Sequence, residues 1–233
     1  MRILALLRTA SPTANFLAAS STVALLLKVL VLDQLPEMFP GAHKAGLLSD
    51  AILTSVVASY VFYLLVVHVK EQTDKDTLRP YIQKHATRVV GDCLSQLSEI
   101  SKTTGSALSL DSVEKEDVLA AFAKIQPYSP APLIISPSNA RANWFEYFSY
   151  HEVRTKGSIR KLLDQLVFLD SRLVATITAI DDCSHFTHLS LVRESRVSNA
   201  DLSVWAPPFW DYCVLCRALN SYLSAPGRNL PAS

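Results

Sequence analysis

The sequence predicts an all-α protein in which a two-helix transmembrane hairpin precedes a cytoplasmic helical bundle. Three observations lead to this fold class: two long apolar runs lie near the N-terminus, apolar residues elsewhere recur at helical spacing, and only six of the 233 residues are glycine. Charged residues make up 18% of the chain, against roughly 25% in an ordinary soluble domain. The predicted division is a hairpin over residues 1–69 and a helical domain over residues 70–233.

The clearer apolar run lies between Asp50 and Lys70 and carries no formal charge. As a helix it is about 28 Å long, close to the roughly 30 Å of a bilayer's hydrocarbon core. We therefore predict a transmembrane helix at about residues 47–69. The alternative is a fully buried helix of a soluble protein, for which this uninterrupted run is long.

A second span is predicted at about residues 16–35, where the apolar run is less uniform. Polar residues 20–22 dilute one half of the run, and Lys28 interrupts the other half. A cleavable signal peptide is the alternative interpretation. The apolar run between Arg2 and Arg8 is too short for its hydrophobic region, and no small-residue cleavage site follows the longer run.

Basic residues on the flanks predict the orientation of this hairpin. The connecting loop holds Asp33 and Glu37 with one cation, Lys44. The flanking cations are Arg2 and Arg8 before the first span and Lys70, Lys75, Arg79, Lys84 and Arg88 after the second. The positive-inside rule then places both termini in the cytoplasm and predicts a two-span protein of the cell membrane. This architecture resembles that of bacterial inner-membrane proteins in general, which says nothing about activity.

Lys28 is the unusual residue of the first predicted span, because a cation inside a bilayer is costly unless it pairs or reaches the interface. Asp50 lies at a similar depth near the outer end of the second span. Two hypotheses follow: Lys28 extends its ammonium group outward to the headgroups, or it pairs with Asp50 across the hairpin. A role in an ion pathway is a third interpretation.

Small residues recur every four positions in both predicted spans, which lets helix backbones approach closely in lipid. The stripes are Ala14, Ala18 and Thr22, then Ser20 and Ala24, in the first span, and Ala51, Ser55 and Ser59 in the second. They favour packing within one hairpin or self-association into an oligomer, and the sequence leaves both open.

The predicted cytoplasmic domain is electrically neutral. Residues 70–233 hold 18 of the 22 basic residues and 18 of the 21 acidic residues. Nucleic-acid binding draws its affinity from an excess of cations. The balance therefore argues against a nucleic-acid partner.

The first part of this domain predicts two helices. Apolar residues from Thr77 onward recur at helical spacing and predict a helix that stops near Gly105. Pro80 suits a first turn, where a missing N–H is tolerated, so we expect the membrane helix to end or kink just before it. Asp111 followed by Glu114 resembles a capping box and predicts that a short helix follows.

Four prolines within residues 126–139 exclude a helix there, and we predict a loop. The next segment is dense in aromatic residues, which predicts a core helix of the bundle or a helix that touches the membrane surface or a partner. Its aromatic residues are Trp144, Phe145, Tyr147, Phe148 and Tyr150.

The strongest periodicity of the chain follows and predicts one central helix of the bundle. Its apolar stripe consists of Ile159, Leu162, Leu166, Leu169, Leu173, Thr176 and Ile180. Charged residues at 164, 170 and 172 argue against a third membrane span. A last helix is predicted after Pro207 and Pro208, ending at Pro226 and Gly227.

One cluster of residues has the side chains that bind metals: Asp181, Asp182, Cys183, His185 and His188. On a helix, Asp181, His185 and His188 would share a face. With Cys213 and Cys216 the two histidines would supply the ligands of a tetrahedral zinc site. Reduced cysteines among apolar neighbours are more typical of a core, so we assign no metal, cofactor or catalytic residue.

No nucleophile elbow, phosphate-binding loop or metal-binding helix motif occurs in the sequence. The first functional hypothesis is therefore a membrane-anchored helical protein without catalytic activity, whose partners are the lipid bilayer and another protein or a second copy of itself. The second is an oligomeric pore or membrane-perturbing effector controlled by the cytoplasmic domain. The third is a membrane-tethered enzyme whose site has no recognised motif.

Overall fold

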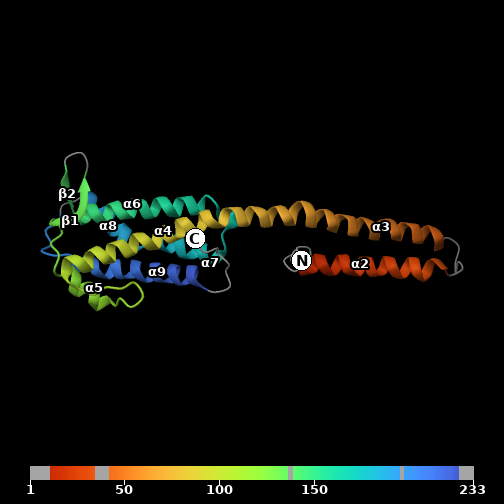
Figure 1. Ribbon diagram of the computed structural model, residues 1–233, viewed down its shortest axis with the longest axis horizontal. Helices are drawn as coiled ribbons and strands as arrows, with labels where there is room; N and C mark the ends of the chain where they lie inside the picture. The colour runs from red at the N-terminus through yellow and green to blue at the C-terminus, as the bar shows by residue number, and fades with distance from the viewer. Residues whose placement is uncertain (1–10, 35–41, 136–138, 195–196, 226–233) are drawn as a thin grey trace. The chain divides into compact units, whose positions relative to one another are not determined.

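The structure is a computed structural model that describes residues 11–34, 42–135, 139–194 and 197–225 (Figure 1). The described chain is mostly helical, which confirms the all-α fold class in its coarse form. The chain divides into two compact units, unit 1 (Met1–Thr77) and unit 2 (Leu78–Ser233).

Unit 1 contains two long helices, α2 (Pro12–Leu30) and α3 (Ala42–Phe62), which lie against each other. A short 3-10 helix, η1 (Leu32–Gln34), follows α2. Both long helices begin earlier than the predicted spans at 16–35 and 47–69. Two helices of the described chain, α2 and the helical run from Lys44 onward, are long and apolar enough to cross a membrane.

The chain passes from α3 without a break through a π-helical turn, η2 (Tyr63–His68), into α4 (Val69–Thr104). The expected end of a helix before Pro80 is wrong, because this proline lies inside α4. The loss of one backbone donor is tolerated here because the residues that follow are held by burial in unit 2. The change in helical geometry falls at η2 instead, where the N–H of Val69 donates to the carbonyl of Leu64.

The predicted end of α4 is confirmed, whereas the predicted capping box of the next helix is wrong. Gly105 follows α4 with a φ of 66°, the left-handed conformation that glycine adopts at low cost, which confirms the predicted stop. The next helix, α5, covers Lys115–Phe122. Its capping box joins Glu114 to Asp117, whose carboxylate accepts the Glu114 N–H at 3.2 Å. The expected box between Asp111 and Glu114 is therefore one turn too early.

The proline-rich segment predicted as a loop, residues 126–139, contains a β-strand. β1 (Pro130–Ile135) pairs antiparallel with β2 (Ala140–Asn143), with Pro130 opposite Asn143. Prolines fit this strand because the described sheet has two strands, so both are edge strands. The segment is correctly predicted to be non-helical, but the strand was missed.

The single central helix predicted over residues 159–180 is wrong. The structure divides this stretch between α6 (Trp144–Leu163), a 3-10 turn, η3 (Leu166–Phe168), and α7 (Ser171–Asp181). α6 and α7 then pack against each other. The regular spacing therefore comes from two helices that each bury an apolar face.

Local side chains explain the break between α6 and α7. The carboxylate of Asp170 accepts the N–H of Leu173 at 2.9 Å and so starts a new helix. Leu166 and Val167, which would face the core of a continuous helix, are 53% and 87% exposed. Sequence periodicity alone did not detect this helix start, because the apolar residues continue at steps of three and four through the turn.

The aromatic segment forms the first turns of α6 and lies in the core, as one of its two interpretations predicts. Trp144, Phe145, Tyr147 and Phe148 are buried, whereas Tyr150 is exposed. The start of α6 is fixed by a capping box in which the Glu146 N–H donates to the Asn143 side chain at 3.0 Å.

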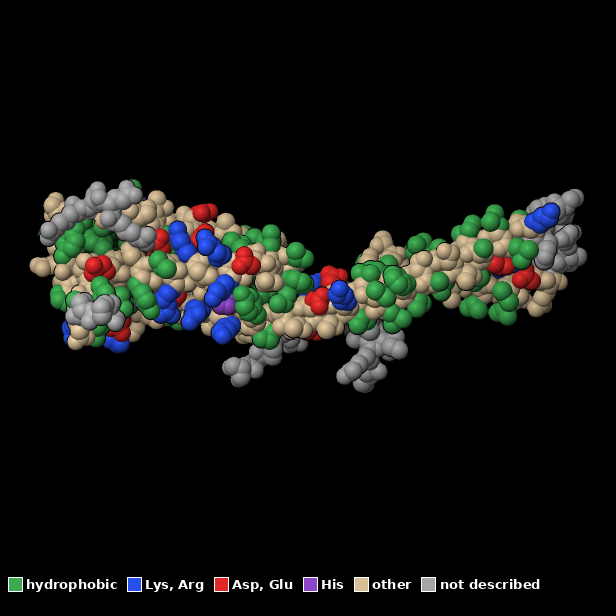
Figure 2. Space-filling model, turned by 90° about the horizontal axis from the view of Figure 1, so that it is seen from above, with side chains coloured by type: hydrophobic (Ala, Val, Ile, Leu, Met, Phe, Trp, Pro, Cys, Tyr) green, Lys and Arg blue, Asp and Glu red, His purple; other side chains and the backbone are tan. Residues whose placement is uncertain are grey.

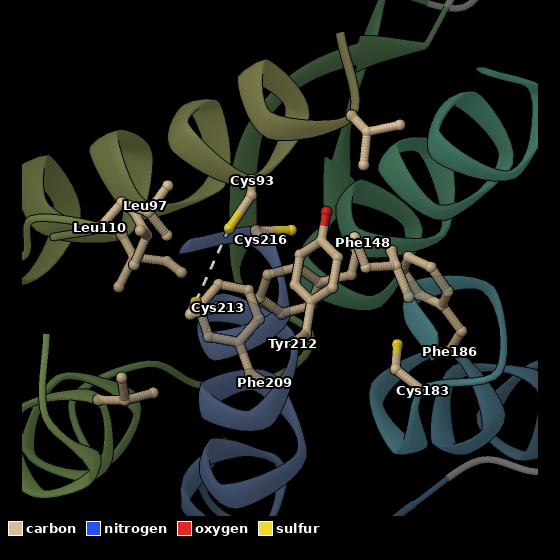
Figure 3. Packing of buried hydrophobic residues seen from close by; sticks show 14 of the residues in the cluster. Cys93, Leu97, Leu110, Phe148, Cys183, Phe186, Phe209, Tyr212, Cys213 and Cys216 are labelled. Carbon is tan, nitrogen blue, oxygen red and sulfur yellow. Dashed lines mark hydrogen bonds between the residues drawn. The ribbon is translucent and has the colours of Figure 1, made fainter. Parts of the chain in front are cut away.

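The last described elements are α8 (Ser184–Glu194), η4 (Ser203–Trp205) and α9 (Ala206–Ser224). α9 confirms the predicted final helix, and it packs against α5, α7 and α8. The expected stop signals Pro226 and Gly227 lie outside the described residues. The core of unit 2 lies where α9 meets α4 and α6, and it is rich in aromatic rings and thiols (Figure 3).

Candidate functional site

A charged pair joins the two long helices of unit 1. The Nζ of Lys28 on α2 lies 2.6 Å from a carboxylate oxygen of Asp50 on α3 and 3.0 Å from one of Asp33. Gly46 leaves room for this pair, since a Cβ at that position would come within 3.3 Å of the Lys28 Cε. Of the two main hypotheses for Lys28, pairing with Asp50 is the one that the structure shows.

A second polar contact joins the same two helices farther from their connection, where the Tyr60 hydroxyl donates to the side-chain oxygen of Asn15. Between these contacts, the less exposed side chains of each helix recur at spacings of three and four. These residues are Ala14, Ala18, Ser21, Leu25 and Lys28 on α2 and Gly46, Asp50, Leu53, Val57 and Tyr60 on α3. The helix contact is therefore polar at each end and formed by small and apolar residues between.

Only some residues of the predicted small-residue stripes lie in the contact between α2 and α3. Ala14 and Ala18 lie in it, but the other members are exposed: Ser20, Thr22, Ala24, Ala51, Ser55 and Ser59. Ser55 and Ser59 line a shallow hollow of about 290 Å³ together with Ala14 and Ala18. The structure thus leaves the stripe on α3 open along one side of the helix pair.

The predicted metal-ligand cluster is dispersed. Asp181 ends α7 and His185 begins α8, so the single helical face proposed for them does not form. His188 is exposed, and its Nδ1 lies 2.6 Å from the carbonyl oxygen of Ser184. Within the described ranges, no three His, Cys, Asp or Glu residues are arranged to hold a metal ion.

His185 is part of the aromatic core. Its ring stacks on Tyr212 with centroids 5.5 Å apart and meets Phe209 and Phe148 edge-on. Neither ring nitrogen has a hydrogen-bond partner among the described residues. Burial lowers the pKa of His185 to about 3, so the imidazole is neutral at physiological pH.

The four cysteines are free and buried, and three of them lie between α4 and α9 (Figure 3). The Sγ of Cys93 lies 3.8 Å from that of Cys213, and Cys216 lies one turn further along α9. Burial raises the pKa of the Cys93 thiol, and it raises that of Cys183 to about 12. Because the thiolate is the reactive form, these groups are suited to packing rather than to nucleophilic or redox chemistry.

The main buried charge of unit 2 is Asp92 on α4, which sequence reasoning did not find. Its carboxylate, 2% exposed, lies 3.0 Å from the guanidinium of Arg154 on α6. Its other neighbours on α6 are the His151 ring and the Thr155 hydroxyl, each 3.5 Å away. His151, Arg154 and Thr155 lie about one helical turn apart on α6. This spacing is the sequence signal for the site.

The arrangement around Asp92 is suited to holding two helices together. Arg154 also donates to the Tyr150 hydroxyl at 3.0 Å, so the cation is fixed on two sides. The carboxylate has a cation, an imidazole and a hydroxyl around it, and none of these faces a described hollow. We therefore interpret the cluster as a structural clamp between α4 and α6.

The surface of unit 2 has a hollow of about 450 Å³ between α6, α8 and the segment before β1. Its lining combines apolar and polar side chains: Tyr128, Asn143, Phe145, Glu146, Ser149, Leu189 and Val192. Glu146 is engaged in capping α6. This composition is typical of a protein contact surface.

Comparisons with protein-family models, with curated proteins and with solved structures find no match to this chain.

Replacing Asp92 by Asn removes the charge that Arg154 faces while keeping the side-chain shape. We expect the free energy of unfolding of unit 2 to fall by about 2–3 kcal/mol, because a buried charged partner is lost. All three tryptophans lie in unit 2, so denaturant titration of the detergent-solubilised full-length protein, followed by tryptophan emission, reports on this unit. The matched control is Glu99→Gln on the same helix, which breaks the more exposed pair with Lys102 and should cost less than about 1 kcal/mol. Equal losses in the two variants would contradict the clamp.

The burial of all four cysteines predicts their reactivity. At pH 8 a thiol with a pKa of about 12, as at Cys183, is ionised in only about one molecule in 10⁴. We expect none of the four to react with a water-soluble disulfide reagent within minutes in the folded protein, and all four to react after unfolding. A thiol titration with and without denaturant measures this, and one rapidly reacting cysteine in the folded protein would contradict the packing in Figure 3.

Proposed function

We propose that the chain is a two-span membrane protein whose helical unit 2 lies in the cytoplasm and acts through contacts with another protein or with a second copy of itself. The observation that supports this most strongly is the exposure of apolar side chains on α2 and α3. The most exposed of them are Phe16, Val23 and Leu30 on α2 and Leu48, Ile52 and Phe62 on α3.

Such helices are not explained as the core of a soluble protein. In the most apolar parts of α2 and of the run that contains α3, only 11% and 6% of the residues are buried. A core helix is covered on most sides, whereas these helices are covered only where they touch each other. A lipid environment would cover the remaining sides.

The internal polar contacts agree with this environment. In lipid, an ionisable group must pair or reach the interface. Lys28 and Asp50 pair with each other, and the Tyr60 hydroxyl bonds to Asn15. Both contacts lie between the two helices, where they would be shielded from lipid tails.

The proposed orientation rests on the charges at the flanks. Arg2 and Arg8 precede α2, and cations follow η2 from Lys70 onward. The connection between α2 and α3 has two acids and no Lys or Arg, and one cation, Lys44, lies at the start of α3. By the positive-inside rule, this distribution favours cytoplasmic termini. Unit 2 would then lie in the cytoplasm.

The proposal of an interaction function rests on surfaces that are open to a partner. On unit 2 the hollow beside Tyr128 and Leu189 offers a mixed apolar and polar surface. On the helix pair of unit 1 the exposed stripe of Ala51, Ser55 and Ser59 allows close approach of another helix. The pore alternative is less well supported, because the pair with Asp50 gives Lys28 a structural role.

Labelling of single introduced cysteines tests the topology. Ala45→Cys, near the start of α3, should react with a membrane-impermeant maleimide on intact cells, and Leu119→Cys on α5 should react only after permeabilisation. Both positions are exposed in the structure, so differences in reaction report the side of the membrane. The unmodified chain serves as the control, since its cysteines are buried. Labelling of Leu119→Cys on intact cells would contradict the cytoplasmic placement of unit 2.

A further inference from the structure

Three exposed cations of unit 2 lie around the buried side chain of one histidine. His85 lies on α4 between Lys84 and Arg88, and Lys161 approaches it from α6. Burial, followed by the positive charges of Lys161, Lys84 and Arg88, lowers the pKa of His85. Figure 2 shows Lys and Arg side chains beside a His side chain on the face that it displays.

These three cations have no acidic partner among the described residues, in contrast to three other cations of unit 2. Lys102, Arg154 and Lys156 each lie within ion-pair distance of a carboxylate. None of Lys84, Arg88 and Lys161 does so within the described ranges of the chain. The three cations therefore give this part of unit 2 a local positive charge, although the unit as a whole is nearly neutral, with 16 basic and 15 acidic residues.

Exposed apolar side chains follow Lys161 in the sequence. η3 begins five residues after Lys161, and in it Leu166 is 53% and Val167 87% exposed. Val167 is the most exposed large apolar side chain that the structure describes. Three unpaired cations and an apolar turn thus form one surface, here called the basic–apolar patch: Lys84, Arg88, Lys161, Leu166 and Val167.

The patch lies at the end of unit 2 where the chain enters from unit 1. α4 and α6 run antiparallel, because Ser95 contacts Tyr147 near one end and His85 is close to Lys161 near the other. η3, which follows α6, is therefore level with the first residues of unit 2, around Pro80. Leu78, where unit 2 begins, comes only nine residues after Val69, the last residue of the apolar run. Lys84 and Arg88 of the patch follow Val69 by 15 and 19 residues in the same helix, or about 22 and 28 Å, which limits how far they can lie from the end of the apolar run.

We infer that the basic–apolar patch binds the anionic phospholipid surface of the membrane that α2 and α3 are proposed to cross. The inference rests on the proposed membrane anchoring. Lys and Arg side chains are attracted to anionic headgroups within a Debye length of the surface. Apolar side chains beside them enter the boundary between headgroups and acyl chains. The patch has both parts and the short tether keeps it close to its ligand, so binding sets the position of unit 2 on the membrane.

The test uses full-length protein in vesicles, with an environment-sensitive fluorophore on Val167→Cys. We expect brominated lipids to quench its emission at least three-fold more strongly in vesicles with 30% phosphatidylglycerol than in pure phosphatidylcholine vesicles. A fluorophore on Leu119→Cys serves as the positional control. Leu119 lies on α5, near the far end of α4, where the side chain of Lys124 reaches the carbonyl of Thr104. It should be quenched weakly in both.

Charge removal tests the role of the cations. The variant with Lys84→Gln, Arg88→Gln and Lys161→Gln should lose the extra quenching in anionic vesicles. The matched variant with Lys102→Gln, Lys115→Gln and Lys124→Gln removes the same charge from exposed positions elsewhere in unit 2 and should keep it. Tryptophan emission confirms that both variants are folded.

Alkaline carbonate washing separates the two proposals. Protein that resists extraction but shows equal quenching in both vesicle types, or no effect of the Lys84/Arg88/Lys161 substitutions, would overturn the patch and leave the membrane anchoring intact. Protein that the wash removes would overturn both. If the triple variant loses a co-purifying acidic protein while its lipid quenching is unchanged, the patch binds a protein rather than lipid, and the inference is wrong.

Discussion

The apolar side chains of α2 and α3 are the constraint on which the account of this chain depends. Phe16, Val23, Leu48 and Leu65 are each more than half exposed, and no described part of the chain covers them. Apolar surface left in water costs about 25 cal/mol for each Å². Two polar contacts of unit 1 lie between the helices instead, Lys28 with Asp50 and Asn15 with Tyr60. This arrangement is the reverse of a water-soluble helix pair, and it agrees with the proposed lipid environment.

Unit 2 follows the opposite rule, with aromatic rings and thiols inside and charges outside. Asp92 and Glu152 are buried carboxylates, and the contact of Asp92 with Arg154 fixes α4 against α6. The continuous helical run through α3, η2 and α4 carries the chain into this core, and it has an apolar, then a charged, then an amphipathic part. In the proposed membrane arrangement, the position of unit 2 would depend on the stretch between Val69 and the basic–apolar patch.

Long apolar runs and the glycine that stops α4 were predictable from the sequence because each is a local signal. The two long helices of unit 1, the stop at Gly105 and the final helix after Pro207 all follow from residues within one or two turns. The break before Asp170 was not predicted, because a turn that keeps the apolar spacing is invisible to periodicity. The strand that begins at Pro130 was missed as well. The prolines of this segment exclude a helix, but they do not show that the segment pairs with β2.

The candidate site was predictable only in part. The similar predicted depth of Lys28 and Asp50 in the hairpin was sufficient to propose their pairing as one of two main hypotheses, and the structure shows this pair. The contact of Asp92 with Arg154 joins residues more than sixty positions apart, and its prediction requires knowledge of how α4 and α6 pack. The cysteines illustrate the same limit, since Cys93 meets Cys213 from a distant helix.

The most direct test of the central claim is the environment of the exposed side of α2. Spin labels on single cysteines at Val23, Leu27 and Leu25 can be compared in reconstituted vesicles by their collisions with oxygen, which dissolves in lipid, and with a water-soluble nickel complex. The account predicts high oxygen and low nickel accessibility at Val23 and Leu27, and low accessibility to both at Leu25, which lies on the side facing α3. High nickel accessibility at Val23 and Leu27 would place this side of the helix in water and contradict the account.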